Sequence, residues 1–354
     1  MTLRTDSVVI IGGGQSGLAG AQAARDAGLT PIVLEAGDRP VGSWPSYYDS
    51  LTLFSPARYS AFPGTPFPGA PDRYPSRDEV VAYLERYADG LGVEIRTKTR
   101  AVSVATEGDG LLVRTEAGDS IRAGAVIAAS GSFTNPFVPA IPGAESFTGE
   151  VLHVAGYRDP KAYAGKQVVV VGAGNSAVQV AYELAEHAAV TLAVRAPVQF
   201  VPQVRGGKDL HFWLHALRVD LLPPSVLARL FSGKPVLDAG RYAEALAAGR
   251  FGQRPVFTAF TEDQVVWPDG ERQRVDVVVF ATGYRPNLPY LAGLGALTED
   301  GLPLHRRGLS TTQPGLGFLG LEFQRSFSSN TLRGVHRDAK FVVKALARQL
   351  RRGR

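Results

Sequence analysis

The sequence predicts an α/β fold with two dinucleotide-binding (Rossmann-like) domains, one inserted into the other. An apolar strand, a glycine-rich turn and a helix occur in this order twice, near residue 8 and again near residue 168. Each copy is followed by a second apolar strand, which completes a βαβ unit. The chain has 354 residues, which is enough for two domains of ordinary size.

The first copy begins with Val8–Ile11, an aliphatic run typical of a strand that is buried on both faces. The glycine-rich turn follows directly, and a helix is expected from Leu18 to about Ala27. The next strand, Pro31–Glu35, ends in an acid 23 positions after Gly12. An acid in this place is positioned to hydrogen-bond a ribose.

The first turn has the pattern Gly-x-Gly-x-x-Gly, in which each glycine has a separate physical task. The first permits a tight turn, the second lets the backbone approach a pyrophosphate, and the third allows close packing of helix on strand. The N-terminus of the helix stabilises the phosphate charge. The residues expected to contact this dinucleotide are Gly12, Gly14, Gln15, Ser16, Gly17 and Glu35.

The second copy repeats this logic, with Ala177 in the third glycine position. Its strand is 167–171, its helix 178–187 and its returning strand 190–195, which ends in Arg195 where the first copy has an acid. Arginine pairs with a 2′-phosphate, which favours NADPH, although NADH stays possible and Arg195 can also be a plain exposed strand end. The residues expected to contact this second dinucleotide are Gly172, Gly174, Asn175, Ser176, Ala177 and Arg195.

The remaining elements follow from local patterns. Residues 40–77 predict a long irregular loop, and loops of this length inside a domain are usually functional. Residues 200–252 are expected to be mostly helical and irregular. Amphipathic helices are expected at 78–91 and 338–351, and further strands near 93–97, 101–105, 111–115, 121–122, 125–129 and 275–280.

Two such turns imply two dinucleotides, of which one is a bound flavin and the other a hydride donor. The unit with the acid fits the ADP half of FAD, and the unit with Arg195 fits NADPH. We therefore expect a discontinuous FAD-binding domain, residues 1–158 and 272–354, and an inserted NADPH-binding domain, residues 159–271.

Composition excludes several classes of function. The chain has no cysteine, so disulfide exchange and thiolate metal sites are excluded, and we expect no metal. The net charge is only +5 and no run of Lys or Arg indicates a nucleic-acid surface. No apolar stretch of about 18 residues and no leader pattern are present, so we expect a cytoplasmic protein without a membrane partner.

Between the two copies, the sequence Phe147-x-Gly149-x-x-x-His153-x-x-x-Tyr157 resembles the fingerprint of the flavin-containing monooxygenases. Phe280–Tyr284 is similar to a second signature of that family, an Ala-Thr-Gly strand end where its two domains meet. The resemblance covers nearly the whole chain and is closest to short bacterial members. Further similar segments are Gly42–Trp44, Tyr74–Arg77, Ala129–Gly131 and Leu332–Val335.

The resemblance implies that FAD and NADPH act together with O2 on a small-molecule substrate. NADPH reduces the flavin, and a flavin C4a-(hydro)peroxide then oxygenates a soft nucleophile such as a thioether or an amine. The resemblance adds Ser43, Trp44, Ser130, Gly131, Leu332, Ala281, Thr282 and Gly283 to the expected cofactor contacts. The oligomeric state stays open, with a homodimer as one candidate.

Four residues are candidates for the chemistry. Phe54 stands where larger family members place an asparagine beside the flavin, which implies a missing hydrogen-bond donor. Asn330 precedes the last helix, where it can be an ordinary cap or can bring the helix N-terminus to the flavin. His153 and Tyr157 belong to the fingerprint, and packing between the domains is the alternative interpretation of both.

Other functions stay open at this point. A Baeyer–Villiger-type ketone oxygenase needs an arginine near the flavin, for which Arg58 and Arg325 are candidates, but the fingerprint of that group usually ends in Trp rather than Tyr157. An NADPH oxidase or flavin reductase with poor coupling is suggested by Phe54. A redox sensor without turnover is a further alternative, whereas a disulfide reductase is excluded because the chain has no cysteine.

Overall fold

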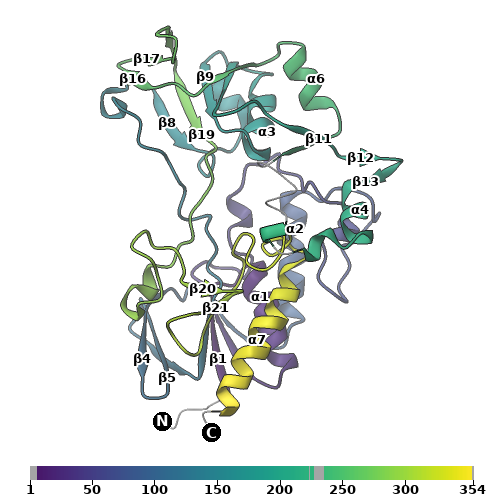
Figure 1. The fold of residues 1–354 in the computed structure, drawn as a ribbon, viewed down its shortest axis with the longest axis vertical. Coiled ribbons are helices and arrows are strands. Elements are labelled where there is room, and N and C mark those ends of the chain that lie inside the picture. The colour runs from purple at the N-terminus through teal and green to yellow at the C-terminus, as the bar shows by residue number, and fades with distance from the viewer. Residues whose placement is uncertain (1–5, 223, 227–234, 353–354) are drawn as a thin grey trace.

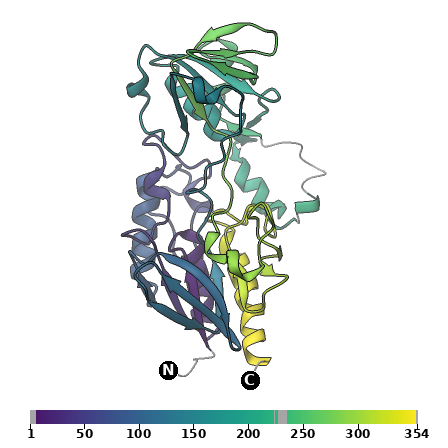
Figure 2. The ribbon, with the colours of Figure 1, turned by 90° about the vertical axis from the view of Figure 1, so that its left-hand side faces the viewer.

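The structure is a computed structural model that describes residues 6–222, 224–226 and 235–352. Two α/β domains are stacked along the long axis of the molecule (Figures 1 and 2). The predicted fold class, two dinucleotide-binding units in one chain, is confirmed by two separate parallel sheets, each with a strand–turn–helix unit at its centre. No helix in the described residues is long and apolar enough to cross a membrane.

The first domain is built on a seven-stranded sheet. Strand β1 (Ser7–Ile11) lies inside this sheet, parallel to β2 and β7 on its two sides. The helices α1 (Gln15–Asp26) and α7 (Val335–Arg352) pack against each other on one face. In sheet order the strands are β20 (His305–Arg306), β21 (Leu309–Ser310), β22 (Leu316–Phe318), β7 (Ala125–Ala128), β1, β2 (Thr30–Leu34) and β3 (Glu94–Arg96).

The other face of this sheet carries a small antiparallel sheet. Alternate residues of a strand point to opposite faces. Val8 and Ile10 accordingly join the core with the helices, whereas Val9 and Ile11 join the core beneath the small sheet. This explains why the four residues Val8–Ile11 of β1 are all apolar. The strands of the small sheet are β4 (Ala101–Glu107), β5 (Gly110–Thr115) and β6 (Ser120–Ala123).

The second domain repeats the same three layers around a five-stranded sheet. Val168 and Val170 face the helix α3 (Asn175–Leu184), and Val169 and Val171 face a three-stranded antiparallel sheet. In order, the strands of the main sheet are β15 (Gly252–Pro255), β10 (Ala189–Val194), β9 (Gln167–Val171), β19 (Val277–Phe280) and β8 (Glu150–His153). The antiparallel strands are β16 (Ala259–Thr261), β17 (Gln264–Val266) and β18 (Arg272–Arg274).

The strand pairing differs from the domain limits predicted at 158 and 272. Strands β8 and β19 both belong to the sheet of the second domain, because β19 pairs with β9 on one side and with β8 on the other. Pro136 and Tyr284 form an isolated bridge between the two connecting segments, which run next to each other (Figure 1). From this pairing we propose that the domains change near 136 and near 284.

The helices predicted at both turns and at 78–91 and 338–351 are present. Helix α2 (Arg77–Asp89) starts with a capping box, in which the Ser76 hydroxyl accepts from Glu79 N and the Glu79 carboxylate accepts from Ser76 N. The 40–77 region is irregular as predicted. Its two short 3₁₀ helices are η1 (Trp44–Ser46) and η2 (Ala57–Tyr59), and the others are η3 (Ala144–Ser146), η4 (Pro160–Tyr163), η5 (Val219–Leu221) and η6 (Pro289–Leu294).

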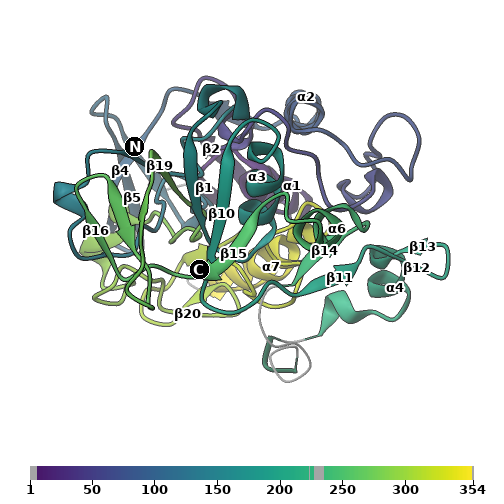
Figure 3. The ribbon, with the colours of Figure 1, turned by 90° about the horizontal axis from the view of Figure 1, so that it is seen from above.

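The described part of residues 200–252 is less helical than predicted. Gly206 and Gly207 both have positive φ, so the chain turns into a hairpin within this region. This hairpin and helix α4 project to one side of the second domain (Figure 3). The elements are β11 (Phe200–Pro202), β12 (Val204–Arg205), β13 (Lys208–Asp209), α4 (Leu210–Ala216), β14 (Val236–Asp238) and α6 (Arg241–Ala247).

Gly17 is the position in the first turn where a side chain is least tolerated. A Cβ there would overlap the carbonyl oxygen of Gly12. We predict that Gly17→Ala lowers the free energy of unfolding by at least about 3 kcal/mol, the upper end of the usual cost of overpacking. Urea unfolding with excess FAD measures this change. Gly174→Ala is the matched control, because its Cβ would meet nothing within 4 Å; equal stability of the two variants would contradict the prediction.

Candidate active site

A cavity of about 1660 Å³ lies where the two domains face each other. Its wall is formed by the first glycine-rich turn, the 40–77 loop, the segment before α7, and the 201–237 region of the second domain. Its volume exceeds the range of about 300–1,000 Å³ that is usual for a single small-molecule pocket. The cavity therefore has room for a large cofactor together with a second molecule.

The first turn presents bare backbone to this cavity. Gly12 has φ +109°, and a Cβ on it would lie 2.5 Å from the carbonyl oxygen of Ala129. Across the turn, a Cβ on Gly42 would lie 2.9 Å from Gly14 Cα. Helix α1 begins here with Gly14 as N-cap and without a side-chain cap. Its first N–H groups are therefore available to a pyrophosphate, which is the group that the sequence predicts at this turn.

Glu35 is held at the end of β2 on the cavity wall. Its side chain is 9% exposed; Oε2 accepts from Gly13 N at 2.6 Å and Oε1 accepts from Gly37 N at 2.7 Å. Thr99–Val102 lines the cavity beside it, because Thr99 N donates to the backbone oxygen of Glu35. This segment was not predicted as part of the site; the sequence carries no motif there, and only the pairing of Thr99 with Glu35 brings it in.

Gln15 connects three distant segments at the other end of the turn. Its Nε2 donates to the backbone oxygen of Asn330 at 2.7 Å, and its Oε1 accepts from Trp44 Nε1 at 3.1 Å. The 40–77 loop and the segment before α7 thus meet over the start of α1. The predicted residues that line the cavity in this domain are Gly12, Gly14, Gln15, Ser16, Glu35, Ser43, Trp44, Phe54, Ser130, Gly131, Asn330 and Leu332.

The second turn is more open than the first. Gly172 has φ +145°, and a Cβ on it would lie 2.6 Å from the carbonyl oxygen of Ala281, so glycine is required there. Helix α3 also starts without a side-chain cap, at Asn175, whose Oδ1 accepts from Leu237 N at 3.2 Å. Of the residues predicted at this turn, Asn175 lines the cavity, whereas Arg195 lies exposed just after β10.

The fingerprint residues lie at the junction of the domains and outside the cavity lining. A Cβ on Gly149 would lie 2.5 Å from the ring of Phe147, which explains the glycine. His153 is buried beside Tyr284, with ring centroids 4.8 Å apart, and its Nδ1 accepts from the backbone N of Ala155. Burial lowers the pKa of His153, and the backbone of Gly283 opposes this shift. We propose that His153 positions the junction and acts on no substrate.

Tyr157 and the Ala-Thr-Gly signature also hold the junction. Tyr157 is fully buried in the core of the second domain, where burial raises the pKa of its hydroxyl, so we propose a packing role. Ala281 N donates to the backbone oxygen of Val171, and the Thr282 hydroxyl donates to that of Phe137. Phe137 N donates in turn to Gly283. Thr282 and Gly283 therefore fasten the two connecting segments to each other, whereas Ala281 continues the pairing with β9.

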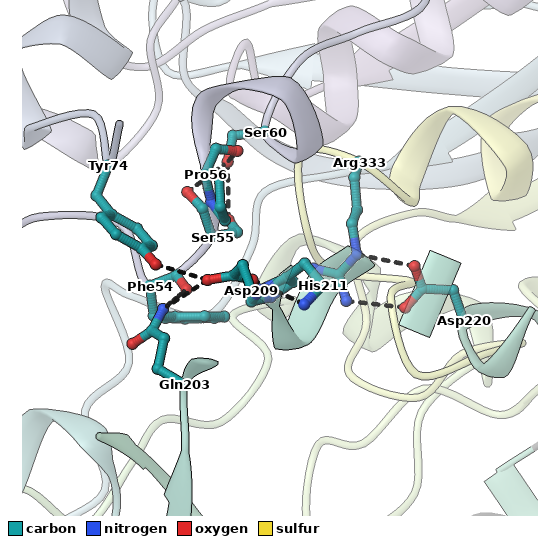
Figure 4. Close-up of polar contacts among 10 residues, drawn as sticks. All are labelled: Phe54, Ser55, Pro56, Ser60, Tyr74, Gln203, Asp209, His211, Asp220 and Arg333. Atoms are coloured by element: carbon teal, nitrogen blue, oxygen red, sulfur yellow. Dashed lines mark hydrogen bonds and ion pairs between the residues drawn. The ribbon is translucent and has the colours of Figure 1, made fainter. Parts of the chain in front are cut away.

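A polar cluster at the N-terminus of α4 was not predicted from the sequence (Figure 4). Asp209 accepts from His211 on one carboxylate oxygen and from Tyr74 on the other, at 2.7 and 2.6 Å. The local sequence indicates only that Asp209, two positions before His211, is a residue type suited to a helix N-cap. The partner Tyr74 comes from the other domain, so no local pattern indicates the pair.

A buried ion pair lies close to this cluster. Arg333 Nε and Nη2 donate to the two oxygens of Asp220 at 3.0 and 2.9 Å, and both side chains are less than 9% exposed. Burial alone would raise the pKa of Asp220, but the hydrogen bonds from Arg333 outweigh this and hold the pKa below its usual value. The pair fastens the segment after α4 to the first domain (Figure 4).

Comparison with known proteins identifies similar families and structures. A model of the pyridine nucleotide-disulphide oxidoreductase family matches residues 9–215. An indole-3-pyruvate monooxygenase, YUCCA1 of Oryza sativa subsp. japonica, is 33% identical over 330 residues, which cover 83% of this chain and 81% of the relative. An uncharacterized oxidoreductase, CzcO-like, of Geobacillus kaustophilus is 31% identical and covers 95% of this chain and 97% of its own.

Solved structures extend this similarity to the fold. The flavin-containing monooxygenase from Stenotrophomonas maltophilia is 32% identical, with a TM-score of 0.83 over 97% of this chain and 99% of that one. An open structure of cyclohexanone monooxygenase is 19% identical with a TM-score of 0.71 over 98% of this chain and 88% of that one, which shows a shared fold only.

Gly174 provides a test of the second turn. A Cβ there meets no protein atom within 4 Å but enters the space that a pyrophosphate would occupy beside the uncapped start of α3. We predict that Gly174→Ala leaves the free energy of unfolding within about 0.5 kcal/mol of wild type. Its KM for NADPH should rise about tenfold or more, with little change in bound flavin. Unchanged NADPH kinetics would show that the turn does not carry the dinucleotide.

Proposed function

The chain belongs to the pyridine nucleotide-disulphide oxidoreductase family as a flavin-dependent monooxygenase that uses FAD and NADPH, and we propose that it oxygenates small thioethers or amines. The observation that carries this proposal is the shared cavity. The FAD turn, the start of α3 and an apolar wall all line one space. A reductant and an oxygen-accepting substrate can therefore reach the same flavin.

The residues of the first domain fit FAD. The uncapped start of α1 beside glycine backbone suits a pyrophosphate, and Glu35 lies where a ribose would be bound. When bound, FAD supplies the oxygen chemistry and NADPH supplies the hydride. The task of the chain is then to hold both, to orient the substrate and to exclude water.

The wall opposite the FAD turn is apolar. Its side chains come from the 40–77 loop, from α4 and from the segment before α7, and they include Phe54, Tyr59, Leu214, Leu217, Phe323 and Phe327. Such a wall keeps bulk water from the reacting centre and favours an apolar substrate with one nucleophilic atom. This supports a thioether or an amine over a highly polar substrate.

The position of two arginines argues against the ketone-oxygenating alternative. Arg58 is an exposed partner of Asp72 at 2.8 Å, and Arg325 pairs with Asp338 at 3.2 Å under the ring of Phe341. Neither of them lines the cavity. Phe54, in contrast, does line it, and its phenyl ring offers no hydrogen bond. Poorly coupled NADPH oxidation is therefore the second candidate function.

Oxygen transfer to a sulfide tests the proposed function. We expect NADPH to reduce the bound flavin without oxygen, and the reduced protein to convert benzyl methyl sulfide to its sulfoxide in air. The amounts of sulfoxide and of hydrogen peroxide formed per NADPH consumed give the coupling of NADPH oxidation to oxygen transfer. Because Phe54 offers no side-chain hydrogen-bond donor to the cavity, we expect part of the NADPH to yield hydrogen peroxide. Peroxide without any sulfoxide or amine oxide would instead identify an oxidase.

Arg195 tests the choice of reductant. We predict that Arg195→Gln raises the KM for NADPH about tenfold or more and leaves the KM for NADH nearly unchanged, because the lost partner is the 2′-phosphate. Steady-state kinetics with both nucleotides measure this difference. Arg272→Gln, an exposed arginine on β18 outside the cavity lining, is the control. An equal loss for NADH and NADPH would refute the role of Arg195 in phosphate binding.

A further inference from the structure

His211 lies in the wall of the cavity, where its imidazole ring is hydrogen-bonded to Asp209. Its side chain is 2% exposed and lies among the lining residues at the start of α4. Nδ1 of His211 is 2.7 Å from Asp209 Oδ1, which also accepts from the backbone N of His211 at 2.7 Å (Figure 4). Among the described residues, none forms a hydrogen bond with the second ring nitrogen, Nε2.

Asp209 decides which nitrogen of His211 carries the proton. Burial alone would raise the pKa of Asp209, but hydrogen bonds from His211 and Tyr74 outweigh burial and hold the pKa below its usual value. The carboxylate is therefore charged at neutral pH and can only accept, so it directs the ring proton of His211 to Nδ1. In an imidazole that carries its one proton on Nδ1, Nε2 is an acceptor with a free electron pair. This arrangement resembles the acid-supported histidine of a general base.

Two aromatic rings and an ion pair surround His211. The rings of Phe54 and Tyr59 lie 6.0 and 6.4 Å from its ring, between centroids. The nearby charges of Asp220 and Arg333 satisfy each other in their two hydrogen bonds. His215, one turn along α4, is exposed and lies outside the cavity lining. His211 is thus a base-type group within an apolar wall.

We propose that His211, positioned by Asp209, removes the proton from protonated amine substrates so that their nitrogen can accept oxygen. This inference rests on the proposed oxygenase function. Alkyl amines are protonated at neutral pH, as the side chain of lysine is with its pKa of about 10.4. An ammonium nitrogen has no free electron pair and cannot be oxygenated, so the proton must leave first.

The step balances without any further reactant. The N–H bond of the ammonium breaks, an Nε2–H bond forms on His211, and the electron pair stays on the substrate nitrogen. The whole reaction is R₃NH⁺ + NADPH + O₂ → R₃NO + NADP⁺ + H₂O, in which nitrogen is oxidised and O2 is reduced. The proton from the ammonium and the hydride from NADPH both end in water, so His211 returns to its starting state after each turnover.

A thioether provides the internal comparison, because its sulfur carries no proton. N,N-dimethylbenzylamine, which is protonated at neutral pH, and benzyl methyl sulfide have similar size. N,N-dimethylaniline is an amine that is largely unprotonated there. With these three probes we measure kcat/KM from oxygenated product for wild type, His211→Gln and Asp209→Asn. Asn keeps the side-chain oxygen that caps α4, so this variant preserves the local fold.

We expect kcat/KM for the benzylamine to fall by about 10²-fold in His211→Gln, the usual effect of a lost general base, and to fall also in Asp209→Asn. The kcat/KM values for the sulfide and for the aniline should change less than about threefold in both variants. His215→Gln, on the same helix and outside the cavity lining, should match wild type with all three probes.

Two results would overturn the inference while leaving the proposed function in place. One is an equal loss with all three probes, which identifies a structural role of His211. The other is an unchanged rate with the benzylamine. If wild type oxygenates none of the probes while consuming NADPH, the proposed function itself fails, and the inference fails with it.

Discussion

Both the fold and the site depend on close backbone packing at the turn between β1 and α1. Gly12 lies against the carbonyl of Ala129 and Gly17 lies against the carbonyl of Gly12, and neither place has room for a Cβ. This close packing brings the uncapped start of α1 to the edge of the cavity. The helix N-terminus then offers unpaired backbone donors to a phosphate.

The second domain uses the same plan with a looser turn. Gly172 is as constrained as Gly12, but Gly174 faces open space and Ala177 replaces the third glycine. A looser turn suits a reductant that must enter and leave in every cycle, whereas the tight first turn suits a flavin that stays bound. The junction fastened by Thr282 and Phe137 then holds the two turns toward one cavity.

The predictable parts of the structure are those fixed by neighbours in the sequence. Val8–Ile11 is apolar at every position because its two faces meet two different cores, so a short window of sequence is enough to indicate a buried strand. The limits that we propose from strand pairing were not indicated by sequence patterns, because β8 has an exposed valine and weak patterning and its place depends on pairing with β19. Contacts such as Tyr74 with Asp209 join residues 135 positions apart, which no periodicity can indicate.

The contacts between domains that sequence patterns could not indicate shape the substrate end of the cavity. Asp220 and Arg333 form a buried pair across the domains, and breaking such a pair leaves a buried charge at a cost of about 3–5 kcal/mol. The pair therefore holds the segment after α4 on the first domain while Tyr74 holds Asp209 from the other side. His211 lies between these two fastenings. The apolar wall and His211 are thus placed by the contact of the two domains, so this end of the cavity is complete only when the domains are joined.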